Sequence, residues 1–197
     1  GGLVGTNNGT ITNSTANATV IAKRNSRIGG LAGVNTGKIS NATANGRVNG
    51  ENAEAIGGLV GRNAGVLNDV RATGDVVDVF TRRIGGLIGV NEKNAQVQNA
   101  HAKNTVTGGD NANIGGLIGL NYGKLTNASA SGKVSGGNSS LIGGLVGDNY
   151  GNLVNVSAQS DVYAGKASLA GGLVGRNNGA TIADAKAQGS VTGVYSR

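Results

Sequence analysis

Short runs of small aliphatic residues alternate with short polar runs along the chain, and this pattern repeats at a nearly constant distance. The triplet Gly-Gly-Leu begins at residues 1, 29, 57, 85, 115, 143 and 171, so all repeats but one are 28 residues apart. Within residues 42–48 small or apolar side chains alternate with polar ones, and a period of two predicts β-strands with one buried face. Helix is disfavoured because each repeat holds several glycines, and each costs about 1 kcal/mol in a helix relative to alanine.

A repeat of this length cannot bury such short strands by itself, but stacked copies can bury them against one another. We therefore predict an all-β fold, a parallel β-solenoid (β-helix) of seven ~28-residue coils without significant helix. The coils begin at the seven triplets and form one repeat domain over residues 1–197. Neither end carries an atypical capping repeat, so we expect the chain to be a section of a longer array.

Stacking would place like residues of successive coils about 4.8 Å apart. Leucine recurs once per repeat and predicts one continuous buried row: Leu3, Leu31, Leu59, Leu87, Leu117, Leu145 and Leu173. Asparagine recurs four residues later and predicts a ladder of amide hydrogen bonds: Asn7, Asn35, Asn63, Asn91, Asn121, Asn149 and Asn177. A second row of Asn or Asp, which begins at Asn13, predicts another ladder. We expect glycine at corners that need positive φ, and IGGLVG as one strand that is apolar on both faces.

Composition and charge exclude several classes of site. The chain has no cysteine, which excludes disulfides and thiolate metal sites, and its recurrent Gly-Gly motif lacks the aspartate of calcium-binding solenoids. GLNYGKLT (residues 119–126) is similar to a phosphate-binding loop but has the wrong glycine spacing and no Ser or Thr after the lysine. No cofactor, metal or catalytic residue is therefore predicted. A lone outward histidine, His101, is expected to be solvated surface.

The net charge of +7 favours anionic partners in general. No long run of like charges indicates a specific nucleic-acid arm, and no apolar run is long enough for a transmembrane segment. Basic residues gather before two of the triplets, where stacking would place Lys23 over Glu51 and Glu54 over Arg82 as a charge ladder. The alternative is an anion or glycan contact made by Lys23, Arg24, Arg27, Arg82 and Arg83.

Two further sets of residues are candidates for surface chemistry. Tyr122 and Tyr150 share a slot just past the recurrent asparagine, where they either bind sugar or cover the corner. Asn-x-Ser/Thr sequons occur at several positions, and those outside the expected ladders are the better glycosylation candidates: Asn8, Asn17 and Asn138.

The motif GGLVGxNxGxI followed by NAxAxGxV resembles the GLUG repeat of bacterial surface and secreted proteins. The resemblance extends over all seven repeats and is strongest at GGLIGLNYGKLTNASASGKV, residues 115–134. It is weakest in the fourth repeat, at NEKNAQVQN, and in the first, where Ala18 replaces a glycine. Such repeats occur in filamentous-haemagglutinin-like adhesins and beside the catalytic part of some streptococcal immunoglobulin A peptidases. The resemblance implies an extracellular or cell-surface solenoid stalk without catalytic residues.

Two hypotheses of function follow. In the first, the chain is a non-catalytic stalk and contact surface of an exported adhesin, whose partner is a glycan or protein on a host or neighbouring cell. In the second, it is a structural extracellular filament in which copies stack end to end by strand addition. An enzyme that acts on polysaccharide is a weaker third, because acids and bases do not cluster within one or two turns.

Overall fold

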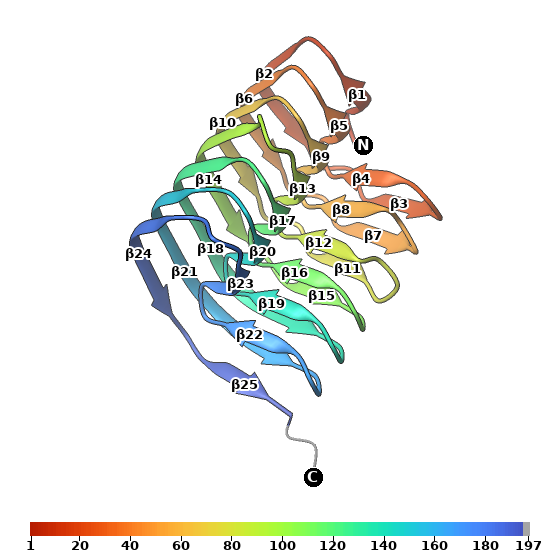
Figure 1. The fold of residues 1–197 in the computed structure, drawn as a ribbon. Helices are drawn as coiled ribbons and strands as arrows, with labels where there is room; N and C mark the ends of the chain where they lie inside the picture. Colours follow the sequence, from red (N-terminus) through yellow and green to blue (C-terminus); the bar gives the residue numbers. More distant parts are fainter. Residues whose placement is uncertain (195–197) are drawn as a thin grey trace.

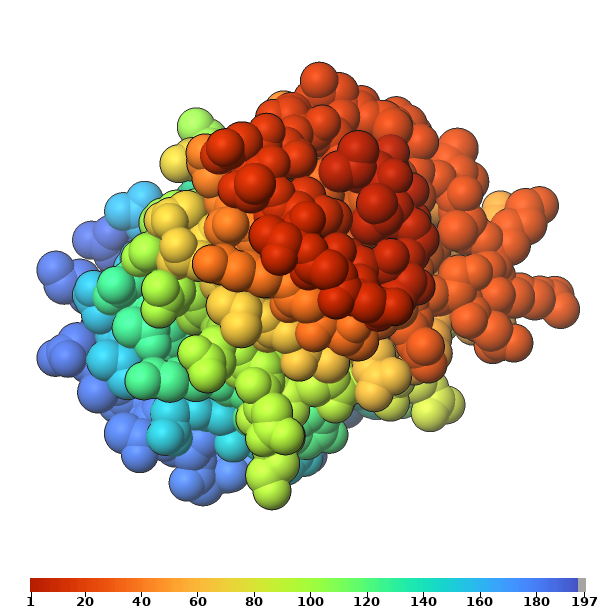
Figure 2. Space-filling model, turned by 90° about the horizontal axis from the view of Figure 1, so that it is seen from above, coloured from red at the N-terminus to blue at the C-terminus, as the bar shows by residue number. Residues whose placement is uncertain are grey.

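The computed structural model describes residues 1–194, and the 25 strands within that range form a parallel β-solenoid of seven coils without any helix (Figure 1). The fold class is therefore as the repeat period predicts. Residues 195–197, at the end of the expected seventh coil, lie outside the described residues. Figure 2 looks onto the first coil, with the later coils behind it in chain order.

Each coil begins with a strand of the first sheet, which has seven strands. Like positions of neighbouring coils pair in parallel, so that Asn7 lies opposite Asn35 and Asn121 opposite Asn149. The strands are β1 (Val4–Asn7), β5 (Ala32–Asn35), β9 (Val60–Asn63), β13 (Ile88–Asn91), β17 (Ile118–Asn121), β20 (Val146–Asn149) and β23 (Val174–Asn177).

The second sheet has 12 strands and occupies the opposite side of the coil in two halves. One half contains β2 (Thr10–Ala16), β6 (Lys38–Ala44), β10 (Val66–Ala72), β14 (Gln96–Lys103) and β24 (Ile182–Gln188). The other half contains β3 (Val20–Lys23), β7 (Val48–Glu51), β11 (Val76–Asp78), β15 (Val106–Gly108) and β25 (Val191–Gly193). Two long strands, β18 (Lys124–Gly136) and β21 (Leu153–Ala164), run through both halves.

The third sheet closes each of the first six coils with a strand of three residues. Its six strands are β4 (Arg27–Gly29), β8 (Ala55–Gly57), β12 (Arg83–Gly85), β16 (Asn113–Gly115), β19 (Leu141–Gly143) and β22 (Leu169–Gly171). The expectation that IGGLVG forms a single strand is wrong. In the third coil its first two residues end β8, the chain bends at Gly58 and Leu59, and its last residues open β9 in the first sheet.

This bend divides the interior into two cores. Leucines of the bend, among them Leu59 and Leu87, pack against the first half of the second sheet and are fully buried. Isoleucines of the third sheet, such as Ile56, pack against valines of the second half, such as Val76. In the end coils the prediction of burial fails in part, because Leu3 is 49% exposed and Leu173 is only half-buried where no coil covers them. The predicted leucine row is therefore continuous and is shielded best in its middle.

Glycine at the bend allows the two sides of the coil to approach each other closely. A Cβ added to Gly58 would lie 3.0 Å from the Cβ of Ala72 on the facing side of the coil, and 2.1 Å from the carbonyl oxygen of Gly86, its equivalent in the next coil. The facing residue is alanine for the same reason, since a larger side chain has no room between the two cores. Glycine is thus required here for space rather than for its backbone freedom.

Asparagine and aspartate, rather than glycine, supply most of the positive-φ corners. Asn41, Asp69 and Asn127 have φ angles of 49°, 53° and 51°, and the same row adopts this conformation in every coil. Among the glycines of residues 1–194, three have such angles, Gly132, Gly179 and Gly189. The expectation that glycine fills the corners is therefore wrong for this row, because Asn and Asp tolerate the left-handed region better than other residues with side chains.

The first asparagine row forms an unbroken ladder inside the solenoid. Each Nδ2 donates to the Oδ1 of the next coil at 2.8–2.9 Å, from Asn7 through to Asn177. The middle members, including Asn91, are fully buried. Five of the seven Nδ2 groups also donate to a backbone carbonyl of the adjacent turn, as Asn63 does to Gly65 at 3.3 Å. The ladder therefore ties each turn to its own coil and to the next.

Replacing a buried ladder residue is expected to destabilise the fold. Asn91→Ala removes the donor to Asn121 and the acceptor for Asn63, and a lost buried partner of this kind costs about 1–3 kcal/mol. Asn45 also bridges two neighbours, Asn17 and Thr73, but it is exposed, so Asn45→Ala is the matched control and should cost less than about 0.5 kcal/mol. Urea titration followed by circular dichroism measures both free energies of unfolding, and equal losses would contradict a special role for the buried ladder.

Candidate contact surface

The outward face of the second sheet carries polar side chains that differ from coil to coil. At one position the seven coils present Thr15, Thr43, Arg71, His101, Ser129, Ser157 and Lys186 in register. Beside them runs the second Asn and Asp row, in which Asn41 donates to Asn13 at 2.6 Å and Asn155 to Asn127 at 2.8 Å. This outer ladder is interrupted at Asp69, where Asn99 donates instead to Asn68 at 3.1 Å.

The five basic candidates do not form one patch. Lys23 pairs with Glu51 at 3.7 Å, as stacking predicts, but Glu54 pairs with Arg27 at 2.8 Å and not with Arg82, so the second expected pair is wrong. The physical reason is that the tip of the third coil, before Arg82, departs from the course of its neighbours. The five residues consequently occupy different parts of the edge: Lys23 and Arg24 line one hollow, Arg83 a second and Arg82 a third, while Arg27 is paired with Glu54.

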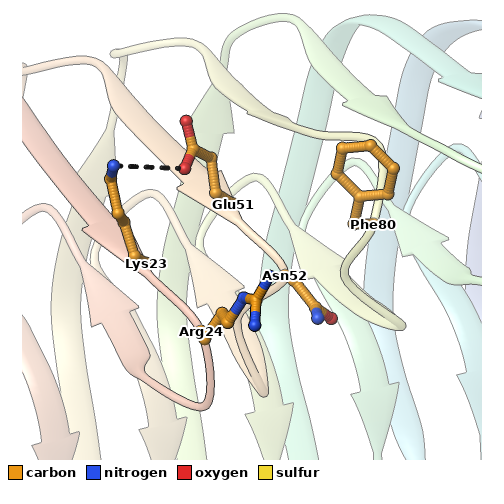
Figure 3. A pocket seen from close by; sticks show the side chains of 5 residues that line it. All are labelled: Lys23, Arg24, Glu51, Asn52 and Phe80. Carbon is orange, nitrogen blue, oxygen red and sulfur yellow. Dashed lines mark ion pairs between the residues drawn. The ribbon is translucent and has the colours of Figure 1, made fainter.

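The hollow that contains Lys23 and Arg24 has a volume of about 420 Å³ and is formed by three successive coils. Figure 3 shows Lys23 and Arg24 from the first coil, Glu51 and Asn52 from the second, and the ring of Phe80 from the third. Phe80 is the only phenylalanine of the chain and its side chain is 69% exposed. Sequence reasoning missed it, although an apolar Val-Phe pair in the slot of Glu51 and Asn52 was a visible signal.

A buried carboxylate holds the loop that presents Phe80. Asp78, at 2% exposure, accepts hydrogen bonds from the backbone N–H groups of Phe80 at 2.7 Å and Thr81 at 3.2 Å. It also accepts from the hydroxyl of Thr81 and from the N–H of Ala53 in the coil before, at 3.4 Å. The same hydroxyl oxygen lies 3.1 Å from the carbonyl oxygen of Ala53, so both acceptors share its one proton. Side chains thus fix this loop to the preceding coil.

The two tyrosines lie at the corner after the first sheet, and Tyr122 lines the same hollow as Arg83 and Glu54. Their rings stack with centroids 5.0 Å apart, and Tyr122 and Tyr150 are 40% and 43% exposed. Close by, the buried carboxylate of Asp148 accepts two hydrogen bonds from Arg176, at 3.0 and 2.7 Å, which raises the pKa of the guanidinium. Together the stacked rings and this pair form a second exposed surface with both aromatic and polar groups.

His101 faces two shallow hollows of the outward face, lined among others by Asp69, Arg71 and Asn99. Its Nδ1 lies 2.8 Å from the hydroxyl oxygen of Ser129 in the next coil. Partial burial and the charge of Arg71 lower the pKa of His101 below 6.5, against the opposing effect of Asp69. The imidazole is half-buried rather than fully solvated, because neighbouring coils flank it.

The three sequon asparagines are all exposed. Each uses its Oδ1 to accept a hydrogen bond from the next coil: Asn8 from Thr36 at 2.6 Å, Asn17 from Asn45 at 2.9 Å and Asn138 from the N–H of Lys166 at 2.8 Å. Their Nδ2 atoms, which a glycan would modify, make no hydrogen bond to residues 1–194. In that part of the chain no three His, Cys, Asp or Glu side chains come together as metal ligands, and no helix could span a membrane.

Comparison with protein families gives one match. A family model described as the GLUG motif matches residues 24–49, 52–77, 81–107, 110–135 and 166–192, which together exceed half of the chain. The stretch between residues 136 and 165 is not matched, yet it supplies β19, β20 and the whole of β21 in register with the other coils. No curated protein and no solved structure matches the chain.

The environment of His101 makes its titration predictable. We expect a folded-state pKa below 6.5 by NMR, raised by Arg71→Gln and lowered further by Asp69→Asn, since each variant removes one charge. Because the unfolded chain then binds the proton more readily, stability should fall as the pH drops from 6.5 toward the folded-state pKa. His101→Gln should abolish that part of the pH dependence, and a pKa that neither substitution moves would contradict the assignment.

Proposed function

The chain belongs to the GLUG-motif family, and from this premise we propose that it is a non-catalytic solenoid segment of an exported bacterial surface protein that acts as adhesin stalk and contact surface. The observation that carries the proposal is the contrast between interior and exterior. Inward positions repeat the same residues, such as the buried leucines and ladder asparagines, whereas the outward slot of Arg71 and His101 holds Thr, Arg, His, Ser or Lys along the seven coils. A stiff interior with a variable exterior suits a scaffold that displays contact residues.

Two surfaces supply chemistry for such contacts. The stacked pair of Tyr122 and Tyr150 offers exposed aromatic faces beside charged groups, and the loop of Phe80 offers another beside Arg24. Aromatic and arginine side chains are the residues that contribute most to binding energy at interfaces. The partner under this proposal is a glycan or protein on a host or neighbouring cell, and the place of action is the bacterial surface or the extracellular medium.

The proposal is tested with the purified chain in two assays. Sedimentation velocity is expected to give a monomer, and the fluorescently labelled chain is expected to bind the surface of intact cells in a saturable manner. The Tyr122→Ser/Tyr150→Ser variant should bind at least threefold more weakly, while Asn45→Ala, on another exposed face, should bind as the parent does. Fibres that grow without a partner would favour the filament alternative, and a monomer that binds no cell would contradict the contact role.

A further inference from the structure

The tip of the third coil breaks the regular stack at the edge between the second and third sheets. At this edge the first, second, fourth, fifth and sixth coils turn through a residue with positive φ: Asn25, Asn52, Asn111, Ser139 and Ala167. In residues 76–83 no residue has a positive φ, and the buried Asp78 organises the turn instead. Because the third tip follows a different course, it opens hollows on both sides, one toward Asn52 and one toward Asn111.

We propose that the hollow between Phe80, Arg24 and Asn52 is a binding site for an acidic sugar, a pyranose that carries a carboxylate. Its volume of about 420 Å³ lies within the range of roughly 300–1,000 Å³ that small-molecule sites occupy. The proposal rests on the proposed contact function and names the chemical class of one ligand.

The side chains around the hollow match the parts of such a sugar. The exposed ring of Phe80 gives an apolar platform for the C–H face of a pyranose. The ion pairs among residues 1–194 involve Lys23, Arg27, Arg62 and Arg176, so the guanidinium of Arg24 has no carboxylate partner there and can bind one in bidentate fashion.

Hydroxyl groups of the sugar have partners as well. The carboxylate of Glu51 accepts hydrogen bonds, and the amide of Asn52 both donates and accepts. The pair of Lys23 and Glu51 is long, at 3.7 Å, and both side chains are well exposed, so a ligand can insert between them at little cost. Phe80 stands opposite these groups, on the far side of the hollow (Figure 3).

Other anionic partners fit the same edge less well. A phospholipid surface would meet the carboxylates of Glu51 and Glu54 together with the cations, and Lys23 and Arg27 are already paired with them. An extended acidic peptide would gain most by adding a strand, but the backbone at this edge is bonded between coils, as Arg24 N–H is to the Glu51 carbonyl. The observations therefore favour a compact ring over an extended chain or a membrane.

Binding is measured by NMR titration of the isotopically labelled chain with N-acetylneuraminic acid, galacturonic acid and, as the neutral control, galactose. We expect the two acids to shift the amide signals of residues 23, 24, 51, 52 and 80, with galactose at least tenfold weaker. Arg24→Ser should abolish the preference for the acids, and Phe80→Ala should weaken all binding at least tenfold. Arg47→Ser, an exposed arginine elsewhere, should change nothing. Arg24 and Phe80 are exposed, so thermal unfolding of their variants should match the parent.

Equal shifts with galactose and the acids, or binding that survives both Arg24→Ser and Phe80→Ala, would overturn the assignment. So would Phe80-dependent binding to phosphatidylserine vesicles, or to a poly-glutamate peptide, without binding to either acid. Cell binding that Phe80→Ala leaves intact, in a chain that binds neither acid, would overturn this site but leave the proposed contact function standing. If the parent chain bound no cells at all, the proposed contact function itself would be contradicted.

Discussion

The structure depends on one constraint, that each coil must lie in register directly over the next. Because the side chains of a strand alternate between faces, a shift of one residue would move every buried side chain to solvent. The amide ladder from Asn7 to Asn177 fixes that register, since each Nδ2 meets the Oδ1 of its equivalent at 2.8–2.9 Å. The close approach of Gly58 to Ala72, where a Cβ on Gly58 would lie 3.0 Å from the Cβ of the alanine, fixes the width of the coil in the same way.

The same constraint explains where the chain varies. Residues that touch the next coil from inside repeat, whereas those that point outward are free to differ, as Thr43, Arg71 and His101 do in successive coils. Extra residues fall where they disturb no pairing, for example in the turn between β13 and β14 just after Asn91. At the tip of the third coil, side chains of Asp78 and Thr81 replace the positive-φ turn that the other coils use at this edge within residues 1–194.

The period of the sequence was sufficient to predict the fold class, the leucine row and the amide ladder, because all three depend only on which residues recur at equal spacing. It could not predict that Gly58 and Leu59 form a bend between two cores, since an apolar run looks the same whether it is straight or bent. It also misplaced the positive-φ corners, where Asn41 and Asp69 stand in place of glycine. The partner of Glu54 was predicted wrongly, because the repeat register shows only which residues occupy equivalent positions in neighbouring coils. The local course of the loop decides whether Glu54 reaches Arg27 or Arg82, and it reaches Arg27.

Stacking of the coils can be tested directly by disulfide cross-linking. The chain contains no cysteine, so two engineered cysteines have no other thiol in the chain with which to pair. Thr43 and Arg71 are register partners in β6 and β10, whereas Thr43 and His101 are two coils apart. Adjacent strands lie about 4.8 Å apart, within the span of a disulfide of roughly 4.4–6.8 Å, and two coils exceed it. Oxidation should therefore cross-link Thr43→Cys/Arg71→Cys within the monomer and leave Thr43→Cys/His101→Cys reduced, as thiol titration and mass spectrometry would record. Cross-linking of both pairs alike, or of neither, would contradict the stacked register.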